Sequence, residues 1–101
     1  MSEFMGNIIG TYDAKEKGFI PGASSLHSCM SGHGPEGEVF EKASNQDLKP
    51  AKVGEGSLAF MFETCFQMKV TKYAQTCNKE EDYIDCWEKS LVKHFNREAT
   101  Q

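Results

Sequence analysis

Three stretches of the chain are predicted to be β-strands, from β-favouring residues or from alternating apolar positions. Residues 3–12 (EFMGNIIGTY) combine β-favouring side chains with interior glycines, which is typical of a strand with a bulge or a close backbone approach. Residues 57–64 (SLAFMFET) give the clearest strand, and apolar residues at both alternate positions predict burial of both its faces. Residues 65–73 (CFQMKVTKY) continue the alternation with one polar face, which predicts an antiparallel strand with that face in water.

Glycine, proline and charged residues fill the segments between these strands. Residues 13–18 predict a charged turn, and residues 19–37 predict a long loop. Loops of that length in a compact domain are usually functional or disordered. Apolar side chains within it can anchor it, which favours function. Residues 38–56 predict a short strand or turn near Val39 and Phe40, followed by an exposed connection.

A helix is predicted over residues 78–96. Asn78 is a candidate N-cap, with Glu81 three residues later as its capping-box partner. Acidic residues near its start and basic residues near its end suit the helix dipole. One apolar stripe recurs at spacings of three and four and is interpreted as core or subunit contact: Tyr83, Ile84, Trp87, Leu91 and Phe95. The chain is therefore predicted to be mainly β, with a C-terminal α-helix.

Length, composition and charge exclude several classes of protein for this chain. The 101 residues allow one domain, with 15 acidic and 11 basic residues and a net charge of −4. No basic cluster is present, so a nucleic-acid partner is not expected. No apolar run is long enough to span a membrane. The four cysteines form no C-x-x-C pair and no leader precedes them, which predicts reduced thiols in a cytoplasmic protein.

Two histidines and one early carboxylate are the candidate metal ligands: Glu3, His27 and His33. Two imidazoles and one carboxylate form the ligand set of non-haem Fe(II) sites. The H-x5-H spacing is a weak signal, because a loop histidine can equally bond to backbone or lie in solvent, and Glu3 can be a surface residue. Cys29 beside His27 is a weaker alternative, as a nucleophile pair.

Longer motifs resemble one known family. The run SEFMG, continued through SLH at residues 25–27 and HGP at residues 33–35, is similar to the C-terminal part of the homogentisate 1,2-dioxygenase family. The similarity continues through FEKAS, AFMFE and VTK and weakens after Tyr73. It implies that residues 1–101 are the C-terminal part of a cupin-like catalytic domain, a β-sandwich or jelly roll. Residues 19–37 would then be its active-site loop.

The resemblance also implies roles for four residues. Glu3 and His33 match ligands of the family's Fe(II), Tyr12 matches a substrate-binding tyrosine, and His33 also borders the substrate. His27 matches a histidine close to the iron that is not itself a ligand, which implies a catalytic role beside it. The family's other histidine ligand would lie upstream of Met1 and is absent from these residues, so the isolated chain is expected to be an inactive fragment.

The reaction implied by the resemblance is an extradiol-type ring cleavage. Homogentisate and O2 would give 4-maleylacetoacetate in the catabolism of phenylalanine and tyrosine, and the family implies homo-oligomers, trimers or hexamers. Two alternatives from other classes stay open. The chain can be a truncated, non-catalytic product, or it can be a small metal-binding or interaction module.

Overall fold

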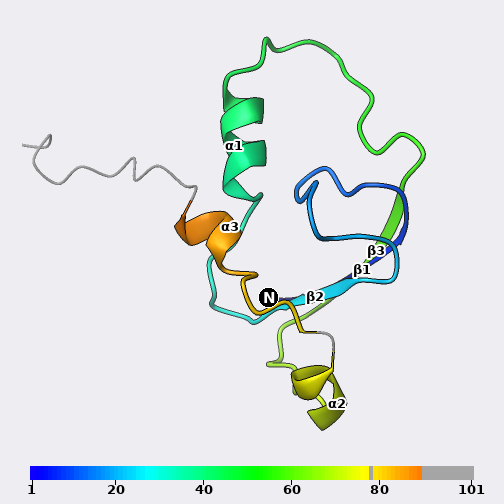
Figure 1. The fold of residues 1–101 in the computed structure, drawn as a ribbon, viewed down its shortest axis with the longest axis vertical. Helices are drawn as coiled ribbons and strands as arrows, with labels where there is room; N and C mark the ends of the chain where they lie inside the picture. Colours follow the sequence, from blue (N-terminus) through cyan, green and yellow to red (C-terminus); the bar gives the residue numbers. More distant parts are fainter. Residues whose placement is uncertain (78, 90–101) are drawn as a thin grey trace, which may run out of the picture.

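A central strand organises the fold. The structure is a computed structural model and describes residues 1–77 and 79–89. Its elements along the chain are drawn in Figure 1: β1 (Ser2–Ile9), β2 (Ser24–His27), α1 (Gly37–Ser44), β3 (Leu58–Thr64), α2 (Lys72–Thr76) and α3 (Asp85–Glu88). The strands form one antiparallel sheet in the order β2-β1-β3. The mainly β class is confirmed.

Strand β1 forms where the sequence predicts it, although it ends at Ile9 rather than at residue 12. The register with β3 shifts between Asn7 and Ile9, which confirms the predicted bulge. Gly6 lies opposite Phe60, and a Cβ on Gly6 would stand 2.4 Å from the Phe60 ring. The close approach expected at the interior glycines is therefore real, because no larger residue fits there without moving the ring.

Strand β3 is also confirmed, but its predicted burial on both faces is wrong. Leu58 is 53% exposed and Phe62 is 66% exposed. Among the described residues β3 pairs with β1 alone, so it is an edge strand. The period-two pattern predicts the extended backbone correctly, whereas burial depends on what covers the strand.

The predicted strand over residues 65–73 is wrong. The chain leaves the sheet after Thr64, and α2 begins at Lys72. Thr71 caps this helix, because its Oγ1 accepts a hydrogen bond from the Ala74 N–H at 3.2 Å. Phe66 is 74% exposed, so its apolar side chain has no sheet face to pack on. Alternation without a pairing partner does not make a strand.

Two further elements differ from the predictions. The strand or turn expected near Val39 and Phe40 is the helix α1, whose first turn is closed by the Phe40 N–H bonding to the Glu36 carbonyl at 2.9 Å. The 19–37 loop contains β2, whose four residues have no apolar alternation and become a strand only because β1 supplies the hydrogen-bonding edge.

The predicted helix start at residue 78 is also wrong. The described helix α3 begins at Asp85, and residues 81–84 form a turn. The acidic side chains expected to serve the helix N-terminus bind lysines instead: Glu81 pairs with Lys79 at 3.1 Å and Glu80 with Lys15 at 3.8 Å. Asn78 and residues 90–96 of the predicted helix lie outside the described residues.

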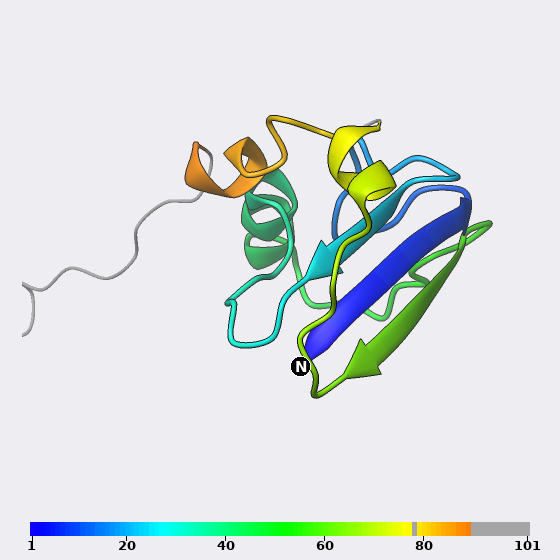
Figure 2. The ribbon, with the colours of Figure 1, turned by 90° about the horizontal axis from the view of Figure 1, so that it is seen from below.

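The buried interior is small and mixed. Met5 and Phe19 are its buried apolar side chains, and Ser2, Asn7, Lys15 and Glu36 are buried polar ones. Asn7 ties β1 to the following loop, because its amide donates to the carbonyls of Gly10 and Phe19 at 2.8 and 2.7 Å. Figure 2 shows α1 and α3 side by side beyond the β2 edge of the sheet.

Two further observations concern the cysteines and the helices of the described chain. The described part of the chain contains all four cysteines and no disulfide between them, in agreement with the predicted thiols. Within residues 1–77 and 79–89, no helix combines the length and the apolar character needed to cross a bilayer.

Candidate metal centre

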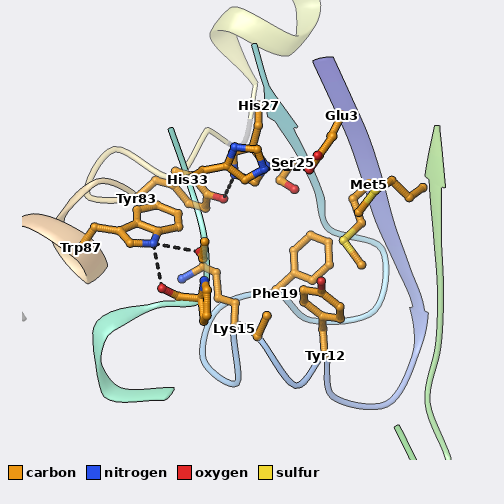
Figure 3. Close-up of a pocket in the computed structure, with 14 residues that line it drawn as sticks. Glu3, Met5, Tyr12, Lys15, Phe19, Ser25, His27, His33, Tyr83 and Trp87 are labelled. Carbon is orange, nitrogen blue, oxygen red and sulfur yellow. Dashed lines mark hydrogen bonds and ion pairs between the residues drawn. The ribbon is translucent and has the colours of Figure 1, made fainter. Parts of the chain in front are cut away.

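The sheet register brings the first two candidate ligands together. Glu3 on β1 lies directly opposite His27, the last residue of β2. Because directly paired residues of antiparallel strands project to the same face, both side chains reach the same space. The loop after β2 then returns His33 to this point, and one donor atom from each of Glu3, His27 and His33 lies within 4.8 Å of the others (Figure 3).

Ser2 fixes the loop that carries His33. Its side chain is fully buried, and its hydroxyl donates to the Phe66 carbonyl at 2.8 Å while accepting from the Cys29 N–H at 3.0 Å. The same loop contains Met30 with a φ of 62°, the single non-glycine residue in the described chain with a positive φ. The loop is thereby anchored close to Glu3 before it reaches His33.

His33 and Glu3 form a hydrogen-bonded pair. His33 Nε2 donates to Glu3 Oε2 at 2.7 Å, and His33 Nδ1 lies 3.2 Å from the Ser31 carbonyl. The hydrogen bond to Glu3 raises the pKa of His33, and the Ser31 carbonyl raises it further. A metal at this position would have to displace the proton, because only a deprotonated imidazole nitrogen binds a metal.

His27 has the opposite electrostatic environment. Its ring stacks on that of His33 with centroids 4.1 Å apart and planes at 15°. Burial lowers the pKa of His27, the neighbouring His33 lowers it further, and Glu3 opposes both effects. Its Nε2 lies 3.0 Å from the Tyr83 hydroxyl, so this nitrogen already has a hydrogen-bond partner. The two histidines predicted from the sequence therefore differ: one pairs with a carboxylate and the other with a phenol.

These groups line one wall of a cavity of about 240 Å³. Tyr12 lines the same cavity and packs edge-on against Phe19, with ring centroids 5.6 Å apart. The structure thus brings together all four residues singled out from the sequence, Glu3, Tyr12, His27 and His33, around one space (Figure 3). Mostly apolar cavities with a few convergent polar groups are typical small-molecule sites.

Lys15, Tyr83 and Trp87 are among the lining residues that were not predicted to belong to the site. Lys15 is buried and ion-pairs with Glu36 at 3.7 Å and Glu80 at 3.8 Å, although the sequence shows it only as one charge in a turn. Tyr83 and Trp87 were assigned to a helical stripe. Their spacing of four was a usable signal, because it predicts the shared face that lines the cavity.

The donor set fits divalent iron. Two imidazoles and a carboxylate are the protein ligands of the non-haem Fe(II) facial triad, and they suit a metal that must keep open positions. Glu3 and His33 present facing donor atoms, whereas the Nε2 of His27 faces Tyr83. All three residues offer a donor atom within 4.8 Å of the others, so the geometry allows His27 as well as Glu3 and His33 to hold the metal.

Comparison with known proteins identifies a family and several relatives that this chain resembles. The family described as "Homogentisate 1,2-dioxygenase C-terminal" matches residues 1–95. The chain is 58% identical to "Homogentisate 1,2-dioxygenase" of Nitrobacter hamburgensis over 97 residues. It is 54% identical over 97 residues to the proteins of the same name from Rhodopseudomonas palustris and Bradyrhizobium diazoefficiens. Each match covers 95% of this chain and 21% of the relative, so the chain spans about a fifth of their length.

Proposed function

Because this chain belongs to the homogentisate 1,2-dioxygenase C-terminal family, we propose that it provides part of the iron centre of an enzyme that cleaves the homogentisate ring with O2 to give 4-maleylacetoacetate. Glu3 and His33 hold Fe(II), and a further histidine from outside residues 1–101 completes the ligand set. The observation that carries the proposal is the meeting of Glu3, His27 and His33 donor atoms within 4.8 Å in a cavity wall.

Bound Fe(II) would supply open coordination positions at which O2 and an electron-rich ring can react. The residues of this chain prepare that reaction. Tyr12 orients the substrate through its hydroxyl, and His33 borders the substrate as well as the metal. Burial lowers the pKa of His27, whose imidazole can hold or accept a proton beside them.

An exchange chimera tests the proposal. The chimera is the Nitrobacter hamburgensis relative in which the 97 matched residues are replaced by the matching residues of this chain. The chimera should bind Fe(II) and consume O2 when homogentisate is added. A chimera that folds and retains iron but consumes no O2 would overturn the proposed function.

The isolated chain provides a second test of the proposed function. Two protein ligands hold iron weakly, so the 101-residue chain with Fe(II), homogentisate and O2 should show no turnover. Tight, stoichiometric Fe(II) binding by the chain alone would instead favour a small metal-binding protein. Calorimetric titration under anaerobic conditions measures this directly.

Tyr12→Phe in the exchange chimera should raise KM for homogentisate about 10-fold while the iron content stays unchanged, because a hydrogen bond to a bound ligand contributes roughly 1–1.5 kcal/mol. Phenylalanine keeps the ring contact with Phe19, so packing is preserved. Steady-state O2 uptake and iron analysis measure the two quantities. Tyr73→Phe is the matched control, since Tyr73 is 72% exposed on α2. An equal loss of iron in Tyr12→Phe would contradict an orienting role.

A further inference from the structure

Two aromatic residues from far along the chain complete the wall of the site. Tyr83 precedes α3 and Trp87 lies within it, and both line the cavity beside His27 and His33. Their rings pack edge-on with centroids 4.9 Å apart. Each also contacts the His27 ring, with centroids 6.2 Å away for Tyr83 and 6.3 Å for Trp87. We call Tyr83 and Trp87 the aromatic pair.

Tyr83 makes a directional contact with His27. Its hydroxyl lies 3.0 Å from His27 Nε2. A phenol O–H is a better donor than a neutral imidazole N–H, and an imidazole nitrogen is a better acceptor than a phenol oxygen. This difference favours Nε2 as the acceptor from Tyr83, which would place the proton of neutral His27 on Nδ1. The hydrogen bond made by one ring nitrogen decides the state of the other.

Trp87 makes the second directional contact, with the loop that carries His33. Its indole N–H lies 3.0 Å from both the Gly34 and the Pro35 carbonyls, and so donates a shared hydrogen bond to them. Gly34 follows His33 directly. This contact fixes the backbone immediately after His33, while the hydrogen bond to Glu3 fixes its side chain at 2.7 Å.

We propose that the aromatic pair positions the two histidines: Tyr83 sets the tautomer and ring orientation of His27, and Trp87 holds the backbone that presents His33. The consequence for turnover rests on the proposed function, but the positioning itself does not. Groups that orient the ligands of metal sites typically change affinity or activity 10–100-fold when they are removed. Neither residue touches the reacting atoms in this proposal, and both act through a histidine.

The tautomer is measured without metal. In the ¹⁵N-labelled 101-residue chain, His27 should show predominantly the Nδ1–H form. In Tyr83→Phe, which keeps the ring contacts and removes the hydroxyl, the Nε2–H form should become the major one. Tyr73→Phe should leave His27 unchanged, since Tyr73 lies on α2 and is 72% exposed. An unaltered His27 tautomer in a folded Tyr83→Phe chain would overturn the assignment, whatever the chain does with homogentisate.

The exchange chimera gives an independent measurement. Tyr83→Phe should lower kcat about 10-fold with iron content and KM unchanged, and Trp87→Phe should weaken Fe(II) binding about 5-fold. Unchanged kcat and iron affinity in both variants would overturn the positioning role. If the unsubstituted chimera is inactive, the proposed function is refuted but the positioning role of the aromatic pair is not. The His27 tautomer and the Fe(II) affinity still test that role.

Discussion

Glu3→Gln should abolish iron retention in the exchange chimera and ring cleavage with it. The substitution removes the carboxylate charge and leaves a side chain of the same shape, whose amide oxygen can still accept from His33 Nε2. The sheet and the loop should therefore survive while the metal is lost. We expect the Fe(II) affinity to fall by at least about 100-fold. This is the upper end of the range for removing a residue that only hydrogen-bonds to a metal ligand. Iron content after gel filtration and O2 uptake measure the two effects.

Glu63→Gln is the matched control. Glu63 lies opposite Glu3 in the β1–β3 register, is exposed, and does not belong to the group of convergent donors. This variant should keep its iron and its activity. If Glu3→Gln retains full iron and activity, the ligand assignment is wrong.

Gly10→Ala should be the most destabilising of the small substitutions. Gly10 has a φ of +75°, and a Cβ there would lie 2.6 Å from the Gly56 carbonyl oxygen and 2.9 Å from the Ser57 Cα. Both obstacles are backbone atoms, so neither can rotate away. The left-handed conformation alone costs about 1–2 kcal/mol for alanine, and we expect a total loss of roughly 3 kcal/mol or more once the clash is added. Urea unfolding of the chain, or thermal unfolding of the chimera, measures it.

Two other glycines separate the cost of the left-handed backbone conformation from the cost of the steric clash. Gly22 has a φ of +89° and open space around it, so Gly22→Ala should cost only about 1–2 kcal/mol from the left-handed conformation. Gly32 also has open space and has no positive φ, so Gly32→Ala should change stability little. Equal losses at Gly10 and Gly22 would show that the approach to Gly56 and Ser57 contributes nothing.

The Gly10 position matters for the site as well as for stability. The Asn7 amide donates to the Gly10 carbonyl at 2.8 Å, and Tyr12 follows two residues later on the way into the cavity. A shift of this turn should therefore also displace Tyr12. In the chimera, Gly10→Ala should raise KM for homogentisate even where enough folded protein remains to be assayed.

Local pattern predicted some elements and not others, for identifiable reasons. The strand β3 was found because apolar side chains recur at alternate positions over its seven residues, and β1 because it is rich in β-favouring side chains. The strand β2 was missed because it is short and polar and depends on the β1 edge. The helix α1 was missed because Val39 and Phe40 suggested a strand, although the helix-favouring residues of EKAS follow them. The predicted strand over residues 65–73 failed because no strand among the described residues pairs with it.

The chemistry of the site was readable from the sequence, since it depends on residue type. Two histidines and one carboxylate predict an Fe(II) site, and the SEFMG and HGP motifs connect them to one family. Spacing along the chain did not show that these groups meet. The distance between Glu3 and His27 is decided by the antiparallel register, and the return of His33 by a loop anchored through Ser2.

The sequence by itself therefore determined which donors this protein has, where its two longest strands lie, and which family it belongs to. The tertiary structure decided which donors face each other, that His27 pairs with Tyr83 rather than with Glu3, and that Lys15 and Trp87 line the cavity. The physical reason is that backbone periodicity and ligand chemistry are properties of short segments. Donor geometry instead arises from strand register and from contacts between residues more than fifty positions apart.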